Sequence, residues 1–346
     1  MTDTADYEWL ARIPKVELHV HIEGAIPHDA LWDLIQKYGG DPTCPDRESL
    51  WRKFEYRDFP HFIEVWLWKN RFLREYEDFT LIAEAVAREF ARQNIRYVEA
   101  FYSPRDFAKH GLRTQELTEA IRAGFARVSD VTIQLVADLI RDFGPEKAAE
   151  TLAEVNEVRS SGVIGVGIGG SEQQFPPEPF ADVYEKARRL GFRTSAHAGE
   201  VAGPVSIWGA IRALQVDRIG HGTRAIEDDR LVDFLAKEQI PIELNPISNV
   251  CTGVIDSIAA HPAKHYLDRG LLVCVNTDDP KMFHNTLADE FWQLQKYLGI
   301  SRDDIRTLIL NGIRAAWLSS ERKRELAAQF KRDPRWNSAA DVPNQE

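Results

Sequence analysis

Histidines and carboxylates gather where four apolar runs of this sequence end. They are His19 and His21 in the first run, His197 and Glu200 in the second, His221 in the third, and Asp278 and Asp279 after the fourth. Burying such groups is costly unless a partner compensates for the lost water. Imidazoles and carboxylates that separate strands bring to one place are what a divalent metal ion needs. The pattern predicts a metal-dependent hydrolase.

The expected ligands are three histidines and one aspartate. His19 and His21 are two residues apart, so on one strand both side chains point to the same face. His197 and Asp278 would complete the set from two other strands, leaving one position open for water. A single histidine could equally be a packed core residue, but four coinciding strand ends favour one ion, whose bound water would have a pKa of about 7.

Two further residues could move protons. His221, between Gly220 and Gly222, is the candidate to orient the water and take its proton, with a structural imidazole as the alternative. Glu200 lies three residues after His197 and suits a general acid. A carboxylate that only satisfies helix N-terminal amides would look the same in sequence. If the strand stays extended, Asp278 and Asp279 point to opposite sides, so that Asp279 can bind a substrate nitrogen.

The elements that must position these residues are eight short, β-branched apolar runs that alternate with helix-like segments. They span 16–22, 95–102, 132–140, 163–169, 193–197, 218–222, 241–244 and 271–277. Nearly continuous apolar strands alternating with helices indicate a parallel sheet covered on both faces. Eight such units predict an α/β fold of the (β/α)8 TIM-barrel type, with the metal site at the C-terminal face.

A doubly wound sheet is the competing architecture. It would place a glycine-rich phosphate loop after the first strand, where this chain has His19 to Glu23 instead. The glycine-rich stretch 165–170 lacks the lysine of a phosphate loop, which argues against nucleotide-phosphate binding. The bare backbone at Gly169 and Gly170 would instead let a flat ligand approach closely.

We expect one barrel domain over residues 1–346, with its core strands within 16–280. Residues 43–76 are rich in aromatics, and Phe59, Phe62 and Trp66 would form either a lid over the barrel mouth or a helix packed on the barrel. Helical patterns fill 284–330, and the polar end 333–346 is expected to fray.

The composition is typical of a soluble enzyme. Hydrophobic residues make up 44% and charged residues 28%, and the net charge of −11 argues against nucleic acid or anionic membranes as partners. Three widely spaced cysteines predict no disulfide framework. With no signal-like N-terminus and no apolar run of about 20 residues, we expect a cytoplasmic protein. The sequence does not determine its oligomeric state.

Several motifs together resemble the adenosine deaminase family of metal-dependent aminohydrolases. They are Pro14 to His21 (PKVELHVH), Tyr102-Ser103-Pro104, Ser195 to Glu200 (SAHAGE), Gly220-His221-Gly222, Asn276 to Pro280 (NTDDP) and Leu287 to Glu290 (LADE). The resemblance implies one zinc ion bound by His19, His21, His197 and Asp278, although iron, cobalt or manganese can share such ligands. It also implies that Glu200 protonates the purine N1, that water activated by the metal and His221 attacks C6, that Asp279 binds N7, and that Gly170 lies against N3.

The resemblance implies a small purine as substrate, with adenosine leading and inosine and ammonia as products. Two departures concern the sugar pocket. Family members that act on adenosine usually carry Asp at the position of Glu23, and those that act on adenine tend to carry Glu. Residues 167–172 read Gly-Ile-Gly-Gly-Ser-Glu where adenosine deaminases typically read Asp-Leu-Ala-Gly-Asp-Glu. Free adenine and aminodeoxyfutalosine are therefore alternative substrates, and a catalytically silent binding barrel is a more distant one.

Overall fold

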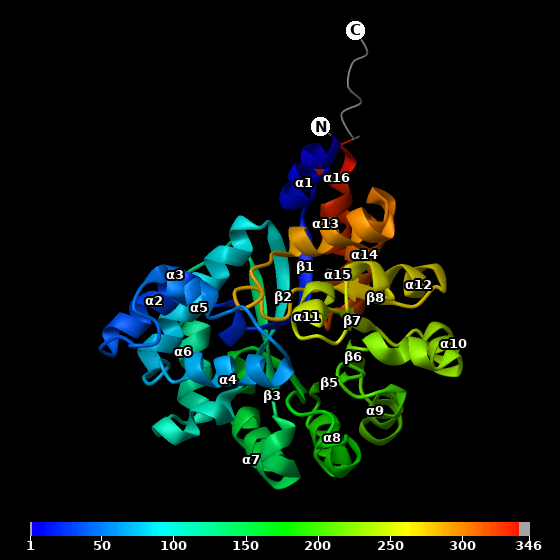
Figure 1. Ribbon diagram of the computed structural model, residues 1–346. Coiled ribbons are helices and arrows are strands. Elements are labelled where there is room, and N and C mark those ends of the chain that lie inside the picture. The colour runs from blue at the N-terminus through cyan, green and yellow to red at the C-terminus, as the bar shows by residue number, and fades with distance from the viewer. Residues whose placement is uncertain (1, 339–346) are drawn as a thin grey trace.

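The computed structural model describes residues 2–338, and its centre is a ring of eight parallel strands (Figure 1). The strands follow one another around the ring in sequence order. They are β1 (Lys15–His21), β2 (Ile95–Tyr102), β3 (Thr132–Asp138), β4 (Val163–Gly167), β5 (Arg193–Ala198), β6 (Arg218–His221), β7 (Ile242–Leu244) and β8 (Val273–Val275). The predicted TIM barrel is confirmed.

Helices surround this ring because each one buries a single apolar stripe against the strands. In α5, for example, Phe79, Ile82, Val86 and Phe90 recur at three- and four-residue spacing and are all buried. The helices up to the eighth strand are α1 (Thr2–Arg12), α2 (His28–Lys37), α3 (Arg47–Arg52), α4 (Phe59–Asn70), α5 (Tyr76–Arg92), α6 (Thr114–Phe125), α7 (Gly144–Glu157), α8 (Ala181–Arg189), α9 (Pro204–Gly209), α10 (Asp229–Glu238), α11 (Pro246–Cys251) and α12 (Ala263–Asp268).

The seam between β8 and β1 is closed by residues that follow β8. The Leu18 amide donates to the side-chain oxygen of Asn276 at 2.8 Å, and the Thr277 amide donates to Glu17 at 2.8 Å. Asp278 then pairs with β1 through its backbone, donating to His19 at 3.1 Å and accepting from His21 at 2.8 Å. Barrel closure therefore runs through the same residues that were expected to bind metal.

The chain ends in α13 (Leu287–Leu298), α14 (Arg302–Ala315), α15 (Ser320–Arg332) and α16 (Pro334–Asn337), which lies near α1 (Figure 1). The Trp9 indole donates to the Arg335 carbonyl at 2.9 Å, which ties these two helices together. Fraying was expected from residue 333, but Trp336 is buried against Phe330, so the apolar tryptophan holds α16 in place. The remainder of that predicted tail, 339–346, lies outside the described residues.

Candidate metal centre and active site

Four side chains converge at the C-terminal ends of β1, β5 and β8. The His197 Nε2 atom lies 3.1 Å from His19 Nε2 and 3.2 Å from His21 Nε2. Asp278 Oδ1 lies 3.5 Å from His19 Nε2 and 3.3 Å from His21 Nε2. Donors bonded at 2.0–2.1 Å to one tetrahedral ion would be roughly 3.3 Å apart. The spacing of these four groups therefore fits a single ion between them.

His221 belongs to the same cluster but sits at its edge. Ligand atoms of His19, His197, His221 and Asp278 all lie within 4.8 Å of one another, so these residues also form a possible metal group. However, His221 Nε2 is 3.9 Å from the nearer Asp278 oxygen. The side-chain amides of Asn249 and Asn245 lie 3.2 and 3.3 Å from its Nδ1. The His221 Nε2 atom is thus farther from the Asp278 carboxylate than the Nε2 atoms of His19 and His21 are.

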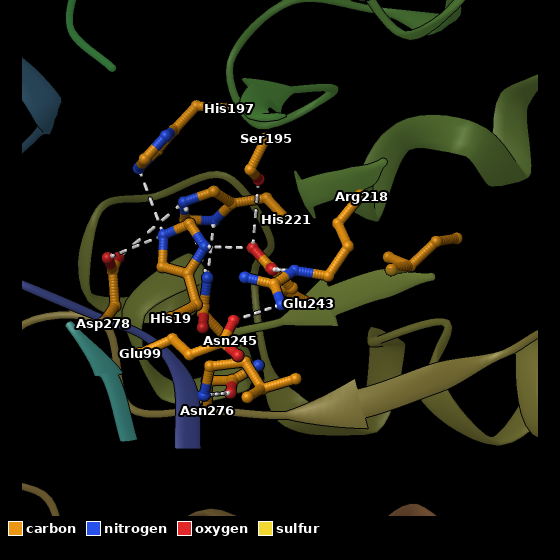
Figure 2. A network of polar contacts seen from close by, with 12 residues as sticks. His19, Glu99, Ser195, His197, Arg218, His221, Glu243, Asn245, Asn276 and Asp278 are labelled. Carbon is orange, nitrogen blue, oxygen red and sulfur yellow. Dashed lines mark hydrogen bonds and ion pairs between the residues drawn. The ribbon is translucent and has the colours of Figure 1, made fainter. Parts of the chain in front are cut away.

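A buried layer of charges supports the cluster from the barrel interior (Figure 2). Glu243 on β7 accepts a 2.8 Å hydrogen bond from His19 Nδ1, which leaves the Nε2 lone pair of His19 free to face an ion. Arg218 on β6 forms ion pairs with both Glu243 and Glu99. On the far side, Arg218 lies 3.6 Å from the ring centre of Trp317. The two carboxylates outnumber the guanidinium, so this layer adds one negative charge beneath the metal site.

Two residues of the cluster have a backbone conformation that non-glycine residues rarely adopt. His221 has φ of 61° and Asp278 has φ of 64°. Asp278 therefore does not continue the extended strand, so the condition under which Asp278 and Asp279 were expected to point to opposite sides is not met. The left-handed turn instead directs Asp278 to the histidines, where Ser248 also donates to it at 2.6 Å. Such strain is typical of functional sites and is sustained by the surrounding structure.

Two carboxyl groups beside the cluster hold protons unusually well. Burial, together with the charges of Asp278 and Glu172, raises the pKa of Glu200 well above its ordinary value. Burial and the charge of Asp278 raise the pKa of Asp279 to about 7. Glu200 lies 3.7 Å from His221 Nε2, whose own pKa burial lowers to about 3. The site thus combines a carboxyl group whose pKa is raised with an imidazole whose pKa is lowered.

Two glycines allow neighbouring carboxyl groups to pack closely against the backbone around the site. A Cβ atom on Gly24 would lie 1.7 Å from Asp279 Oδ1, so only glycine allows that carboxyl group to pack there. Gly170 has φ of 101°, and a Cβ atom there would lie 2.0 Å from Asp142 Oδ2. A side chain would fill the space at both positions, and at Gly170 it would also strain the backbone.

These residues surround one cavity of about 270 Å³. Most of the residues singled out from the sequence line it, namely His21, Phe59, Phe62, Trp66, Gly170, His197, Glu200, His221, Asp278 and Asp279. His19 lies just behind them, within the cluster. Glu23 is buried outside the lining and accepts a 2.8 Å hydrogen bond from the amide of Ser103, which does line the cavity.

Sequence reasoning missed the charged residues inside the strands. Glu99 and Glu243 lie inside β2 and β7, Arg218 is the first residue of β6, and all three are fully buried. A charged residue in the middle of an apolar strand is itself a signal, since it requires a buried partner. The partner assignment depends on which strands lie opposite each other across the barrel, and the sequence does not contain that information.

The barrel and its cluster define a metal-dependent hydrolase with its site at the carboxyl ends of the strands. A sequence model of the adenosine deaminase family matches residues 14–332. The chain belongs to this family, and it is a metal-dependent aminohydrolase that acts on a purine amidine C–N bond.

Individual relatives cover nearly the whole chain. An adenine deaminase of Bordetella avium is 36% identical over 88% of this chain and 98% of its own. An aminodeoxyfutalosine deaminase of Streptomyces avermitilis is 32% identical over 94% of this chain and 92% of its own. A solved amidohydrolase from Burkholderia ambifaria with bound zinc is 28% identical, with a TM-score of 0.86 over 94% of this chain and 92% of its own. Among the described residues, no helix is long and apolar enough to cross a membrane.

Proposed function

We propose that this enzyme removes the 6-amino group of a purine nucleoside with a bulky 5′ extension, and that aminodeoxyfutalosine is the leading substrate. The supporting observation is the mouth of the cavity. Leu67 and Phe143 line it, yet they are 50% and 43% exposed. Large apolar side chains exposed beside a polar site are typical of a surface that a ligand covers. A 5′ extension with apolar surface would cover both residues, whereas the ring of adenine or the hydroxyls of adenosine would not.

Adenine is the second candidate. It is supported by the glutamate at position 23 and by the similarity to the adenine deaminase of Bordetella avium. The adenosine preference expected from the sequence has weaker support, because the curated relatives described above are named for adenine and aminodeoxyfutalosine.

For the metal we propose zinc bound by His19, His21, His197 and Asp278. The spacing of their donor atoms and the zinc in the Burkholderia structure support this assignment. The ion, when bound, supplies the Lewis acidity that makes water a nucleophile at neutral pH.

The residues around the ion provide proton transfer and orientation. Glu200, whose pKa is raised by burial and by the charge of Asp278, would donate a proton to N1 and so draw the electrons of the attacked ring toward that nitrogen. Asp279 would hydrogen-bond N7. Water would add to C6, which becomes tetrahedral. One water proton would return to the Glu200 carboxylate and the other would pass to the amino group, which leaves as ammonia and gives the 6-oxopurine with its proton on N1.

The surroundings of His221 favour an orienting role. The Asn249 amide lies 3.2 Å from Nδ1, and the Asn245 amide lies 3.3 Å from Nδ1 and 3.5 Å from Nε2, so the shorter contacts favour an accepting Nδ1 and a neutral ring with its proton on Nε2. In this tautomer His221 donates a hydrogen bond to the attacking oxygen. Its expected role as proton acceptor would need the other tautomer.

A substrate panel tests the proposal. Protein of measured metal content would be assayed with aminodeoxyfutalosine, adenosine and adenine by the absorbance change that accompanies loss of the 6-amino group. We expect the highest kcat/KM for aminodeoxyfutalosine. A higher value for adenine would favour the second candidate, and no turnover of any 6-aminopurine would overturn both.

Variants at the mouth give the matched control. Replacing Leu67 or Phe143 by Ser should lower kcat/KM for aminodeoxyfutalosine by about 5- to 10-fold each, since each side chain loses roughly 1 kcal/mol of burial. The same variants should leave adenine turnover within about 2-fold, because the ring does not reach them. Equal losses on both substrates would contradict the role assigned to the mouth.

A further inference from the structure

Glu172 gathers four backbone amides of the loop that carries Glu200. Its Oε1 atom accepts from Gly199 at 2.6 Å, and its Oε2 atom accepts from Glu200, Val201 and Ala202 at 3.1, 2.9 and 2.9 Å. Glu172 follows β4, and the loop follows β5, the next strand of the barrel. The side chain is only 2% exposed. One carboxylate thus spans two strand ends and fixes four consecutive residues.

This loop cannot hold its shape through secondary structure alone. Residues 199–203 lie between β5 and α9 and are neither helix nor strand. Gly199 has φ of 74°, and a Cβ atom there would lie 2.3 Å from Ile207, so the loop starts with a turn that only glycine tolerates. Successive amides that point to one side form a concavity for an anion. Here the anion is a side chain of the same protein.

The burial of Glu172 is not explained by an ion pair within residues 2–338. Among residues 2–338, no lysine, arginine or histidine nitrogen lies within 4.0 Å of its oxygens. Its charge is therefore stabilised by amide donors, and hydrogen bonds to an ionised acceptor are stronger than neutral ones. The loop carbonyls are held separately, since Gln173 and Arg224 both donate to Val201, at 2.8 and 2.9 Å.

We propose that Glu172 is a positioning residue that sets the backbone of Glu200 and thereby aims its carboxyl group at the substrate ring. This inference rests on the proton-donor role proposed above for Glu200. The Glu200 amide is bound directly, and the amides on either side of it are bound to the same carboxylate. A shift of this loop would move the donor relative to the ring nitrogen, and a misplacement of about 1 Å can cost about 100-fold in rate.

The test is the Glu172→Gln variant of the metal-loaded enzyme. Glutamine keeps the shape but replaces one acceptor oxygen with an amide that faces other donors. We expect kcat to fall about 10- to 100-fold, KM to change less than about 3-fold, and metal content to stay the same. Hydrogen exchange of the amides at 199–202 should become faster, while exchange in β2 and β3 stays unchanged. The Gln173→Ala variant, which removes one contact to the same loop but none to its amides, should keep kcat within about 2-fold.

A double-mutant cycle separates positioning from general damage. If Glu172 acts through Glu200, adding Glu172→Gln to a Glu200→Gln enzyme should lower kcat no further. If the kcat losses of the two variants multiply, or if hydrogen exchange of the amides at 199–202 is unchanged in Glu172→Gln, the inference is overturned. Should Glu172→Gln not fold, Glu172→Asp keeps the charge at a shorter reach and should show the same exchange and cycle behaviour with a smaller loss. Near-normal activity of Glu200→Gln alone would reject its proton-donor role, and the exchange measurement would still report whether Glu172 holds the loop.

Discussion

Replacing Glu243 with Gln should weaken metal binding although Glu243 lies outside the expected ligand set. Glu243 accepts from His19 Nδ1 at 2.8 Å and forms an ion pair with Arg218. Glutamine provides one oxygen in place of two, so either His19 or Arg218 must face its amide group. The charge that makes His19 a better ligand is lost in both cases.

The size of the effect follows from these two contacts. Loss of a partner that orients a metal-binding histidine typically costs 10- to 100-fold in affinity, or about 1.4–2.7 kcal/mol. Removing one partner from a buried ion pair costs about 3–5 kcal/mol of stability. Arg218 keeps Glu99 as a partner, so we expect the stability loss at or below the lower end of that range.

Chelator competition measures the metal affinity, and denaturant unfolding of the metal-free protein measures stability independently. Tyr97→Phe is the control, because Tyr97 donates at 2.7 Å to Glu99 at the outer edge of the same network. It should change metal affinity by less than about 3-fold. If Glu243→Gln lowers stability while metal affinity stays within 2-fold of the unaltered protein, the coupling between this charge layer and the ion is refuted.

Three further predictions follow from the same geometry. Gly220→Ala should lower metal affinity, because the new Cβ atom would lie 2.7 Å from the His19 ring. Gly203→Ala is the control, because its Cβ atom would have its nearest neighbour at 3.5 Å. Equal metal affinities in titrations of the two variants would contradict this prediction. Asp278→Ala should lose stoichiometric metal, and full occupancy by elemental analysis would reject its ligand role. Burial lowers the pKa of His261 to about 3, below the value of about 6.5 in the unfolded chain, so its neutral form stabilises the fold above pH 6.5. That stability is lost as pH falls toward 3, by up to about 1.4 kcal/mol per pH unit. The free energy of unfolding, measured with urea at pH 7 and pH 5, should fall less between the two pH values for His261→Asn than for the unaltered protein. The asparagine does not titrate but can still accept from the Ala263 amide.

The sequence was sufficient to predict the barrel and the residues that meet at its mouth. Apolar runs show where strands lie, and a parallel barrel brings all their carboxyl ends to one side, so His19, His197 and Asp278 had to be neighbours. No distance information was needed for that step. For the aromatic segment 43–76, the structure shows that α4 contributes Phe59, Phe62 and Trp66 to the cavity. Movement of this helix as a lid stays a prediction.

What the sequence did not reveal depends on contacts across the barrel. Glu243 of β7 accepts from His19 of β1, two strands farther along the ring, and Arg218 of β6 pairs with Glu99 of β2, across the ring. Glu172 follows the glycine-rich stretch 165–170, which superficially resembles a phosphate loop, and only the structure shows that Glu172 binds amides of the loop after β5. The direction of Asp278 depends on one backbone angle that the residue type does not favour.

That angle links barrel closure to metal binding. A non-glycine residue in the left-handed region costs roughly 1–2 kcal/mol, so something must hold Asp278 there. Its amide and carbonyl pair with His19 and His21 on β1, and these are the residues whose rings share the cluster with its carboxylate. An ion between the three side chains would therefore pull together the same two strands that the backbone pairing joins. Ligands that bind only the folded form stabilise it, so ion binding and closure of the β1–β8 seam should reinforce each other.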